Sequence, residues 1–411
     1  MSFISSSSTD SSTSSGPPRP SPSAVFKARE AAAKAKRTAE AAAQAEEIKK
    51  TFKNDKRFEF LSLIAHGQFG STCRVRYKDE ALPDIQDFLV KRSFKSPAAI
   101  RALAVEKRHL GSMRGNRHVV QTIDIPDNPL AKIDEKEWII MEWIACGTME
   151  NFITRAKERL VEGQTLPNRL LWRFFLCLVK SCIAMAHPNA GEIARKGMTA
   201  SGLFHADMHQ GNILLGDPPE DAEHSIAPIM KLIDFGMAEK WPKEKPTAEQ
   251  ENIFDIGCIM LDLIMLRENS QHQEPIYKEF EFRGKKFKTA AGRLIPGVHG
   301  VDKRLAGLIC ACMATNARFR PPLWLLHSDL ATVYIPGRTP DLYQNRAAEE
   351  DEAITKLWRD IVYNGDPPEV ILGPEDEEDD IWSDISSELS VRSNYSGFSD
   401  LLELFPFTYP T

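Results

Sequence analysis

The sequence lacks any long uncharged apolar run. Its longest apolar stretch, Leu170–Ala186, carries Arg173 and Lys180 and is too short to span a bilayer. The sequence also has no excess of basic residues: its 411 residues include 52 Lys and Arg and 58 Asp and Glu. The formal net charge is −6. We therefore expect no membrane anchor and no surface that binds nucleic acid through its phosphates.

Cysteine is scarce, with seven scattered residues. Met1 is followed by a Ser-rich stretch rather than an apolar leader. Both features predict a reducing compartment, the cytoplasm in the first place, with the nucleus not excluded. The two closest pairs, Cys310 with Cys312 and Cys177 with Cys182, have no second pair and no histidine at zinc spacing. We expect no metal site at either pair.

What is present is an ordinary globular composition, 42% hydrophobic and 27% charged, which suffices for a two-lobed core with tails. Residues 1–24 are rich in Ser, Thr and Pro and are predicted to be disordered. Residues 25–55 are rich in Ala, Lys and Glu without a broad apolar stripe, which predicts a solvated helix. The core is expected at 56–335, and an acidic tail at 336–411.

The core changes character near its middle. Residues 56–145 are rich in β-branched and aromatic residues, with strands expected at 59–79 (a hairpin), 87–94, 118–125 and 138–144 and one helix from Pro97. Residues 146–335 show helical periodicity at 148–162, 167–186, 250–267, 302–314 and 320–334, around a short strand pair. The fold class predicted is therefore α+β and bilobal, with a small β-rich lobe followed by a larger, mainly helical lobe.

The small lobe holds the first candidate binding residues. Gly67 and Gly70 lie in the hairpin turn, where glycines let backbone N–H groups approach a phosphate, although taken alone they favour a plain tight turn. Glu106 falls in an apolar helical stripe with Leu103 and needs a partner, since burying a lone carboxylate is costly. Lys91, on an otherwise apolar strand, is the nearest plausible partner, and the pair would aim its ammonium at a phosphate.

The large lobe holds the second group. Asp207 follows His205 by two positions, Asn212 follows Asp207 by five, and Asp234 precedes Phe235-Gly236 at the end of the next strand. Two carboxylates and a carboxamide at one sheet edge are oxygen ligands that suit Mg²⁺. Phosphoryl transfer requires such a metal, an ammonium on the phosphates and a base for the attacking hydroxyl.

In these motifs the chain resembles the protein-kinase-like superfamily, from about Phe58 to Leu330. The matching segments are "HGQFGS", "LVK", "AVEKRHL", "IIMEWIACGTM", "HADMHQGN", "IDFG", "NIFDIG" and "RFRPP". The resemblance implies ATP and Mg²⁺ as cofactors. It also implies that Lys91 binds the phosphates and pairs with Glu106, that Asp207 is the catalytic base, and that Asn212 and Asp234 hold magnesium.

The resemblance extends to adenine binding and to one buried acid. Met141 would guard the adenine pocket, and the backbone of Glu142 and Ile144 would hydrogen-bond adenine. Asp255 would accept backbone N–H bonds from the catalytic loop. Its alternative interpretation is a first-turn acid that the helix dipole favours.

Four departures from the family pattern stand out. Ala65 replaces the first glycine of the phosphate loop, and Thr72 the valine that normally follows it. Ala206 replaces the arginine that normally precedes the catalytic aspartate and receives an activation-loop phosphate. His209 replaces a lysine; it either hydrogen-bonds the transferred phosphoryl group or packs as a loop residue. No Ala-Pro-Glu segment follows Asp234, and only Glu249 or Glu251 could stand in for its acid.

Three functions remain open. The first is an ATP-dependent kinase acting on protein Ser/Thr. The second is a small-molecule kinase, which Ala206 and His209 favour. The third is a nucleotide-binding scaffold with little activity, with both tails as candidate docking segments for protein partners. Residues 187–202 look like an insertion whose role the sequence does not indicate.

Overall fold

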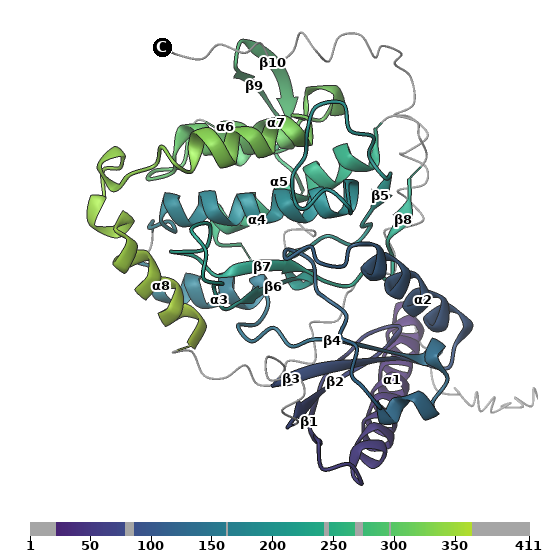
Figure 1. Ribbon diagram of the computed structural model, residues 1–411. Coiled ribbons are helices and arrows are strands. Elements are labelled where there is room, and N and C mark those ends of the chain that lie inside the picture. The colour runs from purple at the N-terminus through teal and green to yellow at the C-terminus, as the bar shows by residue number, and fades with distance from the viewer. Residues whose placement is uncertain are drawn as a thin grey trace, which may run out of the picture.

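The computed structural model describes residues 22–78, 86–161, 163–241, 246–267, 274–295 and 297–363. They form a small lobe built on an antiparallel sheet and a larger lobe built mainly of helices (Figure 1). The predicted bilobal α+β fold is confirmed. The expectations for residues 1–21 and 364–411 lie outside the described residues.

The small-lobe sheet has the order β1-β2-β3-β4, and every neighbouring pair is antiparallel. Its strands are β1 (Phe58–His66), β2 (Gly70–Tyr77), β3 (Asp87–Ser93) and β4 (Trp138–Glu142). Helix α2 (Pro97–Ser112) follows β3 and begins where the sequence predicts. The Ser96 hydroxyl caps it by accepting a hydrogen bond from the Ala99 N–H at 3.1 Å.

The strand predicted at 118–125 is wrong. Val119 forms only an isolated bridge with Leu232 at the end of β7 (Ile229–Leu232), and Thr122 forms another with Met141. The segment therefore pairs with the large-lobe strand β7 at one residue and with the small-lobe sheet a few residues later, so neither pairing extends into a ladder. Its valines are buried all the same, which explains why the segment reads as a strand.

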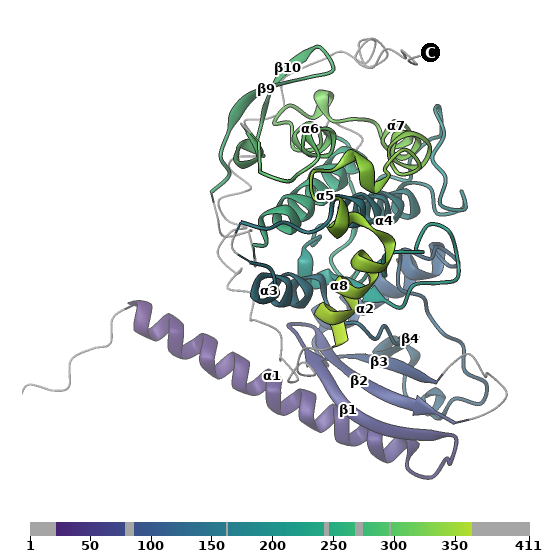
Figure 2. The same ribbon diagram turned by 90° about the vertical axis from the view of Figure 1, so that its left-hand side faces the viewer.

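Helix α1 (Pro22–Phe52) shows that the solvated helix predicted at 25–55 is wrong for its C-terminal part. Figure 2 shows α1 crossing the small-lobe sheet, with its N-terminal end projecting beyond the lobe. The side chains that it buries are Ala41, Gln44, Ala45, Ile48 and Phe52. Gln44 donates to the Ser93 carbonyl at 2.7 Å and accepts from the Ser71 hydroxyl at 2.6 Å. The stripe is narrow and made partly of alanine, so the surrounding Lys and Glu obscure it.

The large lobe is organised around α4, which is buried along almost its whole length. Its helices are α3 (Met149–Arg159), α4 (Asn168–Ala186), α5 (Ala248–Met265), α6 (Lys303–Cys312), α7 (Leu323–Ser328) and α8 (Asp351–Tyr363). Helix α5 begins with a capping box, in which Thr247 and Gln250 each accept a hydrogen bond from the other's backbone N–H. This capping box fixes the residue at which α5 begins.

Short strands carry the polar motifs of the large lobe. They are β5 (Leu203–Phe204), β6 (Ile213–Gly216), β7 and β8 (Glu239–Lys240), with β5 paired to β8 and β6 paired to β7. A further hairpin, β9 (Lys278–Phe282) with β10 (Lys285–Thr289), was not predicted. Its two-residue turn, Arg283-Gly284, has positive φ at both positions, as a tight hairpin requires.

The large lobe does not end at residue 335, so the predicted boundary with an acidic tail at 336 needs correction. Helix α8 packs against α3 and buries Ile354, Trp358 and Ile361. The Arg155 guanidinium also donates to the Val362 carbonyl at 2.9 Å. These buried positions are spaced by four and three residues, so an amphipathic helix extends the lobe to Tyr363 despite its acidic start.

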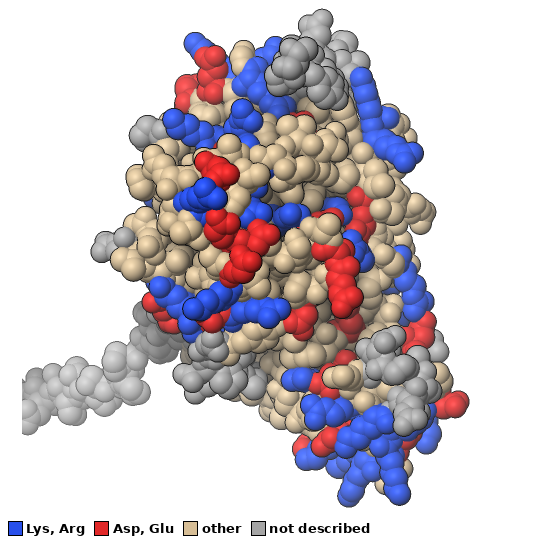
Figure 3. Space-filling view, turned by 60° about the vertical axis from the view of Figure 1, so that its left-hand side comes forward, with Lys and Arg blue, Asp and Glu red and all other residues tan. Residues whose placement is uncertain are grey.

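Figure 3 shows acidic and basic side chains interspersed over the large lobe, with Lys and Arg gathered at the far end of the small lobe. The mixture on this face agrees with the nearly balanced charges of the sequence. None of the helices in the described part of the chain has the length and apolar character needed to cross a bilayer.

Candidate active site

The turn between β1 and β2 holds the two glycines predicted to approach a phosphate. The Gly67 N–H donates to the Gly70 carbonyl at 2.9 Å and closes the turn. A Cβ at Gly70 would lie 2.1 Å from the Arg92 carbonyl oxygen, so close packing against β3 explains this glycine. A Cβ at Gly67 would meet open space, and the phosphate contact therefore stays a prediction for that residue.

Lys91 on β3 lies at the centre of the candidate site. Its ammonium is 2.8 Å from the Glu106 carboxylate on α2 and 3.0 Å from Asp234, which follows β7 in the large lobe. Glu106 is only 2% exposed, as its place in an apolar stripe predicts, whereas the Asp234 side chain is 43% exposed. One ammonium thus joins a buried carboxylate of its own lobe to a solvent-facing carboxylate of the other lobe.

The charges of this group are coupled. Burial disfavours the Lys91 ammonium, but Asp234 and Glu106 outweigh burial and raise its pKa. Burial also raises the pKa of Glu106, to about 7, against the opposing effect of Lys91. Burial would raise the pKa of Asp234 too, yet the nearby ammonium prevails and lowers it. Lys91 and Asp234 are therefore both charged at neutral pH.

The catalytic-loop segment runs from β5 to β6. His205 is fully buried, and its Nε2 lies 3.1 Å from the Ile233 carbonyl, next to Asp234 in the chain. Ala206 and Asp234 both have positive φ, 65° and 60°, which is uncommon for residues other than glycine. Left-handed backbone at residues other than glycine is a form of local strain that is often found at functional sites.

Asn212 links the two acidic motifs. Its Nδ2 donates to Asp207, at 2.9 Å to the carbonyl and 3.0 Å to Oδ2, and its carbonyl accepts from the Ile233 N–H at 3.0 Å. Among the described residues, Asn212 Oδ1 makes no hydrogen bond, and the hydrogen bonds of Asp234 all involve Oδ1, from Lys91 and Gly236. Asn212 Oδ1 and Asp234 Oδ2 are thus left as oxygen donors of the kind that Mg²⁺ prefers, so the residues fit a magnesium ion.

His209 has a structural contact that favours its loop interpretation. Its Nδ1 accepts the Gly211 N–H at 3.1 Å and so caps the turn Gln210–Asn212. The opposite nitrogen, Nε2, lies 3.6 Å from Asp207 Oδ1. His209 therefore positions the loop that carries Asp207 and Asn212, and a contact with a phosphoryl group stays a prediction.

The connection between the lobes contains the predicted adenine contacts. Met141 and Ile144 are buried, and Met141 pairs with Leu89 of β3. The Glu142 carboxylate bonds Lys231 through both oxygens at 2.7 Å, and the Glu142 N–H already donates to the Gln121 carbonyl. The Glu142 carbonyl and the Ile144 backbone remain as candidates for adenine binding.

The buried acceptor for the catalytic-loop backbone is Asn252, and the interpretation of Asp255 in that role is wrong. Asn252 Oδ1 accepts the His205 N–H at 3.2 Å, and its Nδ2 donates to the Leu203 carbonyl at 2.9 Å. Burial, with Glu251 nearby, raises the pKa of Asp255 to about 8. Asn252 and Asp255 both lie near the start of α5, and the sequence alone does not distinguish the side chain that faces the catalytic loop from its neighbour one turn away.

Although the Ala-Pro-Glu segment is missing, an acid of α5 forms an ion pair with a buried arginine. Arg320, 3% exposed, donates to Glu251 Oε1 at 2.8 Å and to the Gln250 carbonyl at 2.9 Å. Glu249 instead accepts the Leu323 N–H at 3.0 Å at the start of α7. Of the two acids that could stand in, Glu251 is therefore the one that anchors α5 to the arginine.

Comparison with known proteins identifies the family of the chain. The model of the protein tyrosine and serine/threonine kinase family matches residues 58–273, just over half of the chain, and the chain therefore belongs to the protein kinase family. Many solved structures match as well; one is a CAK complex from Chaetomium thermophilum bound to ATP-γ-S. The chain of this complex is 12% identical to the present chain, and the match covers 68% of the present chain and 91% of the chain from the complex, with a TM-score of 0.47. No curated protein matches by sequence.

Proposed function

We propose that the chain is an ATP- and magnesium-dependent phosphotransferase that acts on Ser or Thr hydroxyls of proteins. The observation that carries the proposal is the arrangement of Lys91 within 3.0 Å of Asp234, with Asn212 bonded both to Asp207 and to the backbone beside Asp234. Membership of the protein kinase family supports the use of ATP. The location proposed is the cytoplasm or nucleus, which the seven free thiols favour.

In this proposal each residue has one task. Lys91 binds phosphate oxygens and is held in place by Glu106. Asp207 accepts the proton of the acceptor hydroxyl, while the Asn212 amide fixes its carboxylate. Asn212 and Asp234 would hold a magnesium ion, which would neutralise the charge that develops on the phosphates. The turn that the Gly67 N–H closes contributes its other backbone N–H groups to the phosphates, and the chain from Met141 to Ile144 binds the adenine.

A small-molecule acceptor is the second candidate. Ala206 leaves the loop without the arginine that would sense an activation-loop phosphate, and the segment between Asp234 and α5 is short. The short segment reduces the surface available to a protein substrate. Both observations leave the nucleotide and metal residues unchanged, so the two candidates differ only in the acceptor.

The test is ADP release from Mg²⁺–ATP across a peptide panel and a metabolite panel. Wild-type protein is compared with Asp207→Asn and Asp234→Asn, and Asp341→Asn is the control because that side chain is 64% exposed and paired only at the surface. Loss of a general base lowers turnover by about 10²-fold or more. Stimulation by peptides supports the first proposal, and stimulation by one metabolite alone supports the second. Stabilisation by ATP without turnover, unchanged in Asp207→Asn, would instead identify a nucleotide-binding scaffold.

A further inference from the structure

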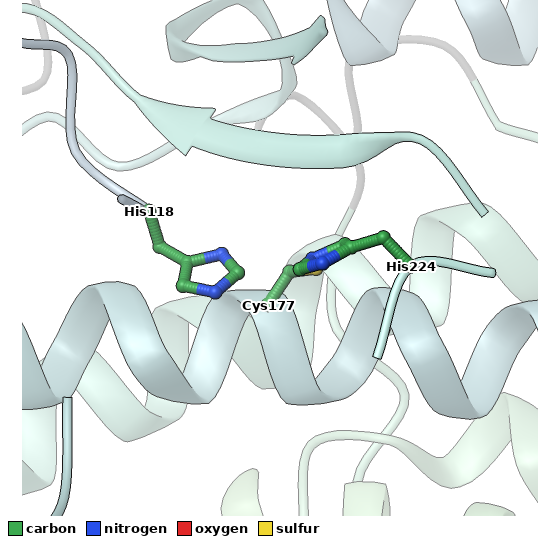
Figure 4. Close-up of side chains that lie close together, drawn as sticks. All are labelled: His118, Cys177 and His224. Atoms are coloured by element: carbon green, nitrogen blue, oxygen red, sulfur yellow. The ribbon is translucent and has the colours of Figure 1, made fainter. Parts of the chain in front are cut away.

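Three buried side chains from distant parts of the sequence converge on the side of α4. Figure 4 shows His118, from the connection after α2, beside Cys177 on α4 and His224, from the loop between β6 and β7. Their ligand atoms all lie within 4.8 Å of one another, and none of the three is more than 1% exposed. They belong to neither the candidate nucleotide site nor its loops. No local cysteine spacing announces this cluster, because its members are far apart in the chain.

The outward-facing atoms of both histidines are already engaged. His118 Nδ1 lies 3.2 Å from the Met230 carbonyl, which can only accept a hydrogen bond, so this nitrogen carries a proton. His224 Nδ1 lies 2.9 Å from the Asp221 carboxylate. Both contacts hold the proton on Nδ1 and leave the Nε2 lone pair of each ring directed at the cluster. Metal-bound histidines are held in the same way, with the second ring nitrogen donating to a carboxylate or carbonyl. His224 Nε2 is 3.5 Å from Cys177 Sγ.

Glu223 supplies a fourth donor at the edge of the cluster. Its Oε1 lies 3.3 Å from His118 Nε2 and 3.7 Å from His224 Nε2, while its Oε2 is held by Lys180. Neither His118 Nε2 nor Glu223 Oε1 finds a hydrogen bond of good geometry among the described residues, although both atoms are buried. Buried polar atoms left in this way are costly and call for an explanation.

We propose that Cys177, His118, His224 and Glu223 bind one zinc ion. A tetrahedral zinc ion places N, O and S ligands roughly 3.3–3.7 Å apart, and three of the separations above already lie in that range. Two imidazoles and a thiolate favour zinc over magnesium or calcium, which prefer oxygen. The thiolate and the carboxylate balance the charge of the ion.

The ion would link three segments of the large lobe: the connection after α2, helix α4 and the loop between β6 and β7. The His118 carbonyl accepts hydrogen bonds from the Leu232 N–H and the Ser181 hydroxyl, so the segment after α2 lies between β7 and α4. Glu192, from the 187–202 segment, reaches the same place, with Oε2 3.8 Å from His118 Nε2. The Glu223 side chain is 20% exposed, but its Oε1 is buried, as are the other three ligand atoms. No coordination position is therefore open to a substrate, and the site is structural.

The test measures metal directly, independently of ATP or phosphate transfer. The full chain, purified without a polyhistidine tag, is stripped with a chelator, reconstituted with Zn²⁺ or Co²⁺ and desalted. We expect about one metal ion per chain by elemental analysis, and a thiolate-to-cobalt charge-transfer band with the strong visible bands of tetrahedral cobalt. Removing the zinc should lower the thermal midpoint.

The matched pair of variants is Cys177→Ser against Cys182→Ser, because both thiols are buried on α4 but only the first faces the histidines. Cys177→Ser should lose the metal and the charge-transfer band, and Cys182→Ser should keep both. If Cys177→Ser does not fold, Glu223→Gln should retain the charge-transfer band but release the metal at lower chelator concentration. Wild-type protein without stoichiometric metal, or equal metal content in Cys177→Ser, would overturn the proposal.

Discussion

Lys91 and Asp234 lie 3.0 Å apart although 143 residues separate them, and theirs is an ion pair between the two lobes at the candidate site. Glu106 holds the same ammonium from the small-lobe side at 2.8 Å. Because Asp234 is more exposed than Glu106, a phosphate can compete with Asp234 for the ammonium while Glu106 keeps the lysine in position. The lysine therefore stabilises the fold and, in the proposed function, also binds the nucleotide.

Replacing Lys91 by methionine should weaken ATP binding and slow turnover. The same change should lower the free energy of unfolding by on the order of 3 kcal/mol, since it leaves Glu106 buried without its partner. Titration with ATP and urea denaturation measure the two effects. Lys95→Met, at an exposed position near the same strand, is the control. Wild-type ATP affinity in Lys91→Met would show that this ammonium does not bind the nucleotide.

The pairing of Lys91 with Glu106 could be predicted because helical periodicity places Glu106 in a stripe with Leu103 and Leu110, all of which are buried. Local periodicity sufficed, since a buried carboxylate in a small lobe has few partners to choose from. The order of Asp207, Asn212 and Asp234 along the chain likewise indicated that they lie together, and their hydrogen bonds connect them.

What could not be predicted depends on the register between distant elements. Asn252 and Asp255 lie one turn apart on α5, and only the packing of α5 against β5 decides which side chain reaches the Leu203 carbonyl. The docking of α1 depends on alanines, whose small apolar area gives little contrast in the sequence. His118 and His224 meet Cys177 only because the fold brings three segments to one face of α4.

Asn252→Ala should disturb the catalytic loop more than Asp255→Asn on the same helix. It removes both hydrogen bonds to the strand before Asp207 and leaves the buried His205 N–H and Leu203 carbonyl without partners. Each such group costs about 1–3 kcal/mol. We expect lower unfolding stability and a fall in kcat, measured by denaturation and by ADP release. Equal effects of the two substitutions would argue against Asn252 as the residue that holds this loop.

Ile48→Ala should destabilise the small lobe by about 2–5 kcal/mol, because Ile48 is fully buried between α1 and the sheet. Lys49→Ala is the matched control, because the Lys49 side chain is 57% exposed. This substitution should change stability by less than about 0.5 kcal/mol. Urea denaturation of the full chain measures both. A change in Ile48→Ala as small as that of the control would mean that α1 is not docked in solution.

Asp255→Asn should change how stability depends on pH. Burial, together with Glu251 and against the opposing effect of Arg320, raises the pKa of Asp255 from its ordinary 3.8 to about 8. Between these two values the native protein keeps a proton that the unfolded chain releases, so this residue makes stability fall as pH rises, by up to about 1.4 kcal/mol per pH unit. Solvent that reaches the half-buried side chain reduces the pKa shift and so narrows the pH range over which this slope applies. The asparagine variant has no such proton, and its free energy of unfolding should therefore gain on that of the wild type from pH 4 towards pH 8 and run parallel above it. Because the two proteins differ at this one side chain, the difference between their denaturation curves reports Asp255 and its interactions with Glu251 and Asp207. A constant difference across this range would contradict the raised pKa.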